Sequence, residues 1–258
     1  MNLAAMVQDI KKRPTAFITM LFLVILGVEL GLWQLRRAEY KIQKVQEIQS
    51  KTQLPFLLAN EKEWIVDEAL YHRMQASGYW LAKQGVWLEN RTHPLGKDPK
   101  TGITTGFNLL MPLRLEGKQN NILWVNRGWV PRNFNELNVV PTIITSSEKV
   151  TVEGVVFPDG GKTLQLSHQT ESFASDGLRI QENLKLDEEE QLHQWHQLHF
   201  VLRQTNSPIT EGLDQLLPAI EKGVNTHYGY AFQWFALAVM TFLFWVITAY
   251  RKKSQSLR

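Results

Sequence analysis

The chain has 258 residues, a formal net charge of +3 and no cysteine. Without thiols it forms neither disulfides nor thiolate metal sites. The positive charge belongs to the tails, because residues 1–14 carry +2 and residues 251–258 carry +4, which leaves −3 for residues 15–250. A middle region without a basic surplus argues against nucleic acid as a partner.

Two apolar segments, residues 15–35 and 227–250, predict transmembrane helices near the two ends of the chain. As helices they would be about 31 and 35 Å long, enough to cross a hydrocarbon core of about 30 Å. A cleavable signal peptide is the alternative for the first segment, since basic residues precede it. No small-residue cleavage site follows, which favours a retained helix.

The distribution of charge predicts the orientation in the bilayer. Basic residues lie before the first apolar segment and directly after the second. By the positive-inside rule, the tails formed by residues 1–14 and 251–258 are expected in the cytoplasm. Two spans with both ends on one side then place residues 36–226 outside the cytoplasm.

The middle region is predicted to be an antiparallel, β-rich α+β domain that begins with a helical stalk. Helix formers fill residues 36–51 before Pro55 ends the helix. Short runs rich in β-branched, leucine and aromatic residues, bounded by Gly, Asn and Pro, predict the strands. These runs are 74–80, 86–92, 107–116, 122–130, 150–157 and 198–205, with a hairpin loop at 117–121, a turn at 158–161 and a short helix at 187–195.

Two Asn-Arg pairs mark candidate binding positions in this domain. One lies in Asn90-Arg91-Thr92-His93-Pro94-Leu95-Gly96 and the other in Val125-Asn126-Arg127-Gly128-Trp129-Val130-Pro131. One interpretation is that each arginine packs on a Trp and fixes a loop through carbonyl groups. The other is that the guanidinium groups of Arg91 and Arg127 bind carboxylates, whose geometry matches a planar fork.

Three histidines, His193, His196 and His199, recur at spacings of three around Trp195. On a helix they would form a drifting stripe, so a solvated helix face is the favoured interpretation over a metal cage. The chain has no serine-nucleophile elbow, zinc-protease pair or phosphate-binding loop, and we therefore do not expect an enzyme.

His227 stands at the start of the second apolar segment, at the expected membrane interface. On a helix, residues 227, 230, 231 and 234 share one face, which carries His, Tyr, Ala and Trp. A flat macrocycle could lie over Ala231 with its iron on the imidazole. The alternative is an interfacial belt in which these side chains only anchor the helix. In either case antiparallel helices bring residues 33–37 to the height of residues 227–230.

Glu29 is an acidic residue within the first predicted span. A charge near the bilayer centre costs about 2.5–3.5 kcal/mol on insertion scales, and less toward the end. We therefore expect Glu29 to face the second helix, a partner protein or water.

Four motifs in register resemble the Surfeit locus protein 1 family over the whole chain. They are Leu-Gly-Leu-Trp-Gln-Leu-Arg-Arg at residues 30–37, the two Asn-Arg motifs, and His-Tyr-Gly-Tyr-Ala-Phe-Gln-Trp-Phe at residues 227–235. The resemblance implies an assembly factor for haem-copper cytochrome c oxidase that assists placement of haem a in subunit I. It implies His227 as the haem ligand.

Within this resemblance we expect Trp33, Tyr230 and Trp234 to line the ring, and Arg36, Arg91 or Arg127 to meet its propionates. The implied partners are oxidase subunit I, haem A synthase and the lipid bilayer. The N-terminal tail carries no amphipathic transit segment, which favours a bacterial inner-membrane protein with a periplasmic domain. The alternative is a scaffold that holds subunit I without binding haem.

Overall fold

The computed structural model describes residues 13–117, 121–161, 172–206, 212–217 and 223–255. The chain divides into two compact units. One unit contains residues 1–46 and 220–258, and the other contains residues 47–219. Residues 118–120 of the predicted hairpin loop, and residues 1–12 and 256–258 of the predicted tails, lie outside the described residues.

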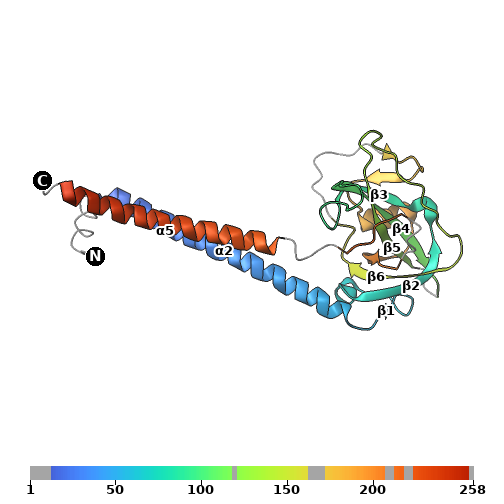
Figure 1. Ribbon diagram of the computed structural model, residues 1–258. Helices are drawn as coiled ribbons and strands as arrows, with labels where there is room; N and C mark the ends of the chain where they lie inside the picture. Colours follow the sequence, from blue (N-terminus) through green and yellow to red (C-terminus); the bar gives the residue numbers. More distant parts are fainter. Residues whose placement is uncertain (1–12, 118–120, 162–171, 207–211, 218–222, 256–258) are drawn as a thin grey trace. The chain divides into compact units, whose positions relative to one another are not determined.

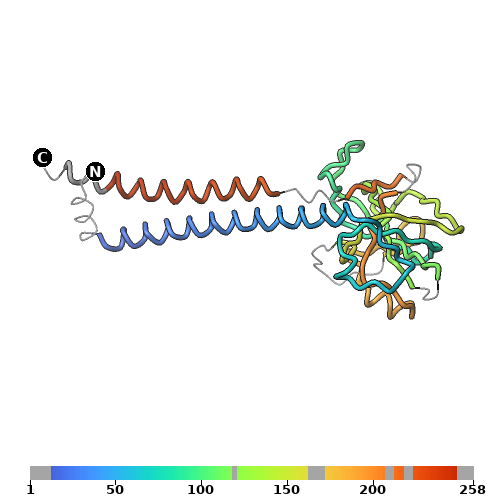
Figure 2. The backbone as a smooth tube through the Cα atoms, turned by 90° about the horizontal axis from the view of Figure 1, so that it is seen from below, coloured from blue at the N-terminus to red at the C-terminus, as the bar shows by residue number. Residues whose placement is uncertain are grey.

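The first unit is an antiparallel pair of long helices, α2 (Pro14–Thr52) and α5 (Val224–Gln255). They run side by side in both views (Figures 1 and 2). Both are long and apolar enough to cross a membrane, as the sequence predicts. Helix α2 continues without a break past the predicted span to Thr52, which confirms that the first helix extends beyond its apolar part.

The second unit is a β-rich domain. Its strands are β1 (Leu57–Leu58), β2 (Arg73–Trp80), β3 (Val86–Thr92), β4 (Thr105–Leu115), β5 (Ile122–Pro131), β6 (Val150–Phe157), β7 (Ser172–Phe173), β8 (Arg179–Gln181) and β9 (Gln197–Gln204). Its helical elements are α3 (Val66–Ala69), the 3₁₀ turn η1 (Ala82–Gln84) and α4 (Leu186–His193). Strands β2, β3, β4, β5, β6 and β9 lie close to the six predicted strands, whereas the short strands β1, β7 and β8 were not predicted.

Five strands close into a barrel in the order β2, β6, β9, β5, β4 and back to β2. Closure requires close backbone approach, and glycine permits it at two junctions. A Cβ at Gly78 would lie 2.2 Å from the carbonyl oxygen of Arg114, and one at Gly154 would lie 2.1 Å from that of Arg203. Strands β3, β8 and β7 extend the sheet beyond β4 (Figure 1).

The expectation of a purely antiparallel sheet was wrong. Strands β1 and β2, β3 and β8, and β5 and β9 pair in parallel. Hydrophobic alternation within a strand records which face is buried, but it carries no information on the direction of a neighbour that lies far away in the sequence. The long connection from β5 to β9 allows the parallel pairing here.

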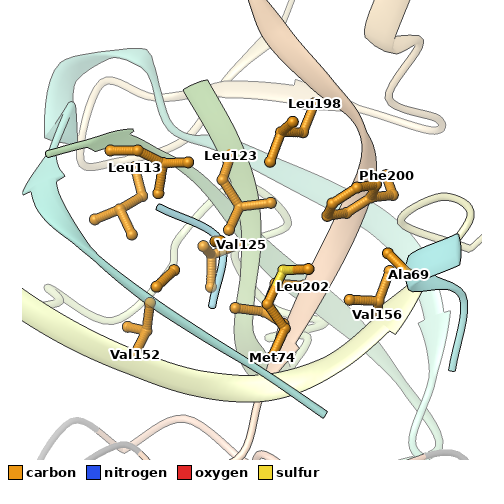
Figure 3. Close-up of a cluster of buried hydrophobic side chains, with 13 residues drawn as sticks. Ala69, Met74, Leu113, Leu123, Val125, Val152, Val156, Leu198, Phe200 and Leu202 are labelled. Atoms are coloured by element: carbon orange, nitrogen blue, oxygen red, sulfur yellow. The ribbon is translucent and has the colours of Figure 1, made fainter. Parts of the chain in front are cut away.

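The barrel interior holds the main hydrophobic core, part of which Figure 3 shows. Every residue of β5 except Pro131 is buried, because one face of the strand lines the barrel and the other packs beneath neighbouring elements. Leu123 and Val125 face the interior cluster, whereas Trp124 packs with Val86 and Val201 outside it. The interior cluster also contains Met74, Leu113, Val152, Leu198, Phe200 and Leu202.

Phe200→Ala tests this core. The side chain is fully buried in the barrel, so its truncation should lower the free energy of unfolding of the domain by about 3–5 kcal/mol. Chemical unfolding of the purified full chain in detergent, followed by near-ultraviolet circular dichroism, measures the change. The matched control is Phe173→Ala, because Phe173 is 53% exposed. Equal losses in both variants would contradict the assignment of the core.

Candidate functional site

Helices α2 and α5 approach each other through small residues. A Cβ at Gly31 would come within 2.5 Å of the Phe235 ring, and one at Gly27 would lie 3.0 Å from the Cβ of Ala238. Glycines spaced by four are a common device for close packing of membrane helices. The residues buried along this seam on α2 are Met20, Gly27, Gly31, Gln34 and Ala38, and those on α5 are Ala231, Ala238 and Trp245.

The seam brings His227, in the first turn of α5, against Gln34 of α2. The Nδ1 atom of His227 and the Oε1 atom of Gln34 are 2.7 Å apart. Because a carbonyl oxygen can only accept a hydrogen bond, Nδ1 is the donor, and in the neutral imidazole Nε2 then carries the lone pair. Within the described residues no hydrogen bond or ion pair engages Nε2. The imidazole is thus oriented through one nitrogen while the other remains available to a ligand.

This contact confirms that residues 33–37 and residues 227–230 lie at one height. Gln34, which is 9% exposed, was not among the candidate residues. Its position could have been found from the sequence, because Gln34 follows Gly27 by seven residues, and a seven-residue interval returns to the same helix face. The pairing of that face with His227 needs the register of the two helices.

The other candidates of the helix pair lie on its surface. Trp33 and Tyr230 are each 49% exposed, Arg36 is exposed and Trp234 is partly buried. Ala231 is only 2% exposed because it packs in the seam. The expectation that a macrocycle lies flat over Ala231 was therefore wrong, since α2 already covers that position.

Glu29 lies off the seam and is exposed on α2. Of the three neighbours expected for it, the second helix is excluded. Its outward position follows from helical spacing, because residues 27 and 31 point toward α5 and residue 29 then points to the opposite side.

In the domain, the two Asn-Arg motifs meet across strand β4. Trp129 donates its indole Nε1 hydrogen to the carbonyl oxygen of Arg91 at 2.9 Å, and its ring packs edge-to-face on His93, with centroids 4.7 Å apart. His93 is 1% exposed, and its Nε2 atom lies 2.8 Å from Asp214 Oδ2. The motifs therefore build one corner of the domain.

Both motifs coincide with β-bulges. The register against β4 shifts between Leu88 and Arg91 on β3, and it skips Arg127 on β5. Asn90 adopts a left-handed φ of 58°, which asparagine tolerates better than most residues. A bulge turns side chains away from the regular alternation of a strand, and it directs both arginines here into the domain.

The two arginines contact different groups. Arg91 is 6% exposed and donates Nη2 to the carbonyl oxygen of Glu182. Burial lowers the pKa of Arg91, an effect that Asp159 and Glu182 oppose. The Arg127 guanidinium stacks over Trp80 at 4.9 Å, and its Nη1 donates to Thr145 Oγ1 at 2.7 Å. These contacts fit the loop-fixing interpretation, while carboxylate binding by either side chain stays a prediction.

The histidine triplet does not form the helix face that the sequence suggested, because α4 ends at His193. Gln194 takes a left-handed φ of 52° that stops the helix, His196 follows in the connection, and His199 lies on β9. His196 and His199 are both exposed to solvent, and each pairs with Glu190, at 3.6 and 3.3 Å. Within the described residues no group of histidines and acids has the geometry of a metal site.

Paired cysteines test the helix register, and the absence of native cysteine makes the readout unambiguous. Gly27→Cys combined with Ala238→Cys should form a disulfide on mild oxidation, because the Cβ positions lie 3.0 Å apart and a small separation of the helices reaches the roughly 3.5–4.5 Å of a disulfide. Proteolysis between the helices, followed by electrophoresis without reductant, detects the bond. Val28→Cys with Val239→Cys is the control, since both side chains are exposed. Equal cross-linking of both pairs would contradict the seam.

Comparison with known proteins agrees with these motifs. The chain matches the SURF1 family over residues 21–239. It is 28% identical over 239 residues to a SURF1-like protein of Rickettsia bellii (strain RML369-C), an alignment that covers 88% of this chain and 86% of that protein. It is 24% identical over 253 residues to a SURF1-like protein of Caenorhabditis briggsae, and that alignment covers 90% of this chain and 74% of that protein. The match covers the domain and reaches into both helices, and the chain belongs to the SURF1 family, which is known for oxidase assembly factors.

Proposed function

We propose that this protein assists the placement of haem a in subunit I of a haem-copper cytochrome c oxidase, with His227 as the iron ligand. The observation that carries the proposal is the hydrogen bond between His227 Nδ1 and Gln34 Oε1. Histidines that bind metals commonly donate the second ring hydrogen to an oxygen, which fixes the ring and raises the basicity of the ligating nitrogen. Gln34 supplies such an oxygen.

The helix pair also presents aromatic surface around this ligand. Tyr230 and Trp33 are about half exposed, and Gly229 has open space where a Cβ would stand. In the proposed complex, Trp33, Tyr230 and Trp234 contact the ring from its edges, since Ala231 is covered by α2. Arg36, exposed one turn beyond Trp33, is the propionate partner on α2. Arg91 and Arg127 remain predicted propionate partners in the domain.

The proposed setting is a bacterial inner membrane. The two candidate spans and the basic tails support an orientation with both termini in the cytoplasm and the barrel domain in the periplasm. Oxidase subunit I is the proposed recipient, and haem A synthase is the proposed source of the cofactor. The helix pair would then act in the bilayer, where an apolar macrocycle partitions.

The test compares the protein with His227→Ala after purification from cells that co-express haem A synthase. The wild type should carry a Soret band, identified as haem a by its pyridine haemochrome, and the variant should lose most of it because the iron ligand is gone. His199→Ala is the control, because that imidazole lies on the exposed face of β9. Haem a retained equally in all three proteins would overturn the assignment of the ligand.

Gln34→Leu tests the orienting hydrogen bond separately. Leucine keeps the seam filled but removes the acceptor for His227 Nδ1, so the affinity for haem a should fall roughly 10–100-fold. Titration of the apoprotein with haem in detergent measures the loss. Gln233→Leu, an exposed position on α5, should bind as the wild type does. Unchanged affinity in Gln34→Leu would show that the hydrogen bond has no part in binding.

Glu29 favours a second candidate function, a scaffold that holds subunit I without binding haem. Its carboxylate is exposed within the predicted span, where a bare charge is costly unless a partner or water meets it. A donor on a helix of subunit I would satisfy this carboxylate. The scaffold and the haem carrier are distinguishable because they depend on different residues.

Co-purification of tagged protein with subunit I distinguishes them. For a scaffold, Glu29→Leu should reduce the recovered subunit I several-fold, while His227→Ala should leave the recovery unchanged. Val28→Leu, a conservative change at the neighbouring exposed position, is the control. Full recovery of subunit I in Glu29→Leu would remove this candidate.

A further inference from the structure

A cavity of about 190 Å³ lies beside the β5 bulge and is lined by residues of the barrel domain alone. Its walls come from β3, β4, β5, β9, the turn at 158–161 that follows β6, and residues 214–216. Most of its polar side chains can donate hydrogen bonds, and one, Asp214, is a carboxylate. The side chains that can donate are Arg91, Thr92, Asn108, Asn126, Arg203, Gln204 and Gln215. Gly160 and Gly161 form one wall and leave it without side chains. The arrangement is a concave site with convergent donors.

Two guanidinium groups meet at this wall. A Cβ built on Gly161 would lie 3.6 Å from Arg203 Nη2 and 4.0 Å from Arg91 Nη1. The space over Gly161 is therefore bordered by both cations. Gly161 has a φ of +91°, and the Asp159 carboxylate holds the turn by accepting the Gly161 N–H at 2.9 Å. Because Gly161 has no side chain, the space beside it is open to the guanidinium groups of both Arg91 and Arg203.

The cavity partly desolvates both cations. Burial lowers the pKa of Arg203 to about 10, Asp159 opposes this shift, and the positive charge of Arg91 adds to it. Within the described part of the chain, the buried Nε atoms of Arg91 and Arg203 have no hydrogen-bond partner. The guanidinium of Arg203 stacks over Phe157 at 4.6 Å. An arginine stays charged at neutral pH, so an acceptor at this site would gain from both groups.

The acids around the site are already engaged. Asp159 acts on both arginines and caps the turn. Glu182 acts on Arg91. Asp214 pairs with His93 Nε2, and its Oδ1 accepts the N–H of Leu216 at 3.3 Å. Asp159 and Glu182 offset part of the charge of the arginine pair, while amide side chains of the cavity lining offer further donors.

We infer that this cavity binds a small oxyanion group, a carboxylate or a phosphate, held between Arg91 and Arg203. Planar guanidinium forks match both groups with paired hydrogen bonds. The cavity volume decides the size of the ligand, because sites for drug-sized molecules occupy about 300–1,000 Å³. It admits a free anion or one acidic arm of a larger molecule, and it excludes a macrocycle. The inference does not depend on the haem role of His227.

Calorimetric titration of the full chain in detergent tests the site, with sodium succinate and inorganic phosphate as separate probes at constant ionic strength. The wild type should bind at least one probe saturably, whereas chloride at the same ionic strength should give no saturable heat. Saturation by succinate alone identifies a carboxylate site, and saturation by phosphate alone identifies a phosphate site. If neither probe saturates the protein at concentrations up to roughly 10 mM, any binding is too weak for a specific site, and the inference is overturned.

Arg203→Gln should weaken binding of the active probe roughly tenfold or more, because a charge-assisted pair is lost. Arg73→Gln is the matched control, since Arg73 is also partly buried and stacks on a phenylalanine, Phe56, at 3.7 Å. Arg203→Lys keeps the positive charge but loses the planar guanidinium group, and its affinity for the probe should lie between that of the wild type and that of Arg203→Gln. Circular dichroism establishes that each variant is folded. Wild-type affinity in a folded Arg203→Gln variant would overturn the inference, whereas His227→Ala should bind the probe normally.

Discussion

The close approach of α2 and α5 at Gly27 and Gly31 is the constraint on which the helix-pair site depends. A side chain at Gly31 would occupy the position of the Phe235 ring, so any larger residue would separate the helices or shift their register. The register, in turn, decides which residue of α2 stands opposite the first turn of α5. A shift of one helical turn, about 5.4 Å, would remove Gln34 from hydrogen-bonding distance of His227. The packing of Gly27 and Gly31, which have no functional side chain, thereby fixes the orientation of the His227 imidazole.

The domain uses backbone geometry in a comparable way. Its barrel closes where Gly78 and Gly154 allow neighbouring strands to touch, and its sheet departs from regular pairing at the two bulges beside β4. These bulges turn Arg91 and Arg127 into the interior, where each meets a different set of partners. Arg127 stabilises a loop through Trp80 and Thr145, whereas Arg91 borders a cavity that also contains Arg203.

Two kinds of ligand chemistry therefore occur in two separate units. The helix pair holds an oriented imidazole with one unengaged nitrogen, which suits a metal centre carried by an apolar ring. The barrel domain holds two guanidinium groups at the wall of a small cavity, the arrangement from which we infer an oxyanion site. An assembly factor works through such sites, since it holds or transfers a component without changing it chemically.

The sequence by itself determined the elements and the candidate ligand. Strand β3 has the predicted bounds, because apolar patterning and flanking turn residues act locally, and the two long apolar segments are helices for the same reason. Tertiary structure decided what local pattern cannot encode. Parallel pairing of β5 with β9, the cover that α2 provides for Ala231, and the partnership of Gln34 with His227 all join residues far apart in the chain. Arg203 has no motif around it, and its place beside Arg91 exists only once β9 enters the barrel. Such contacts depend on register and direction between elements, and these are set by packing across the whole fold.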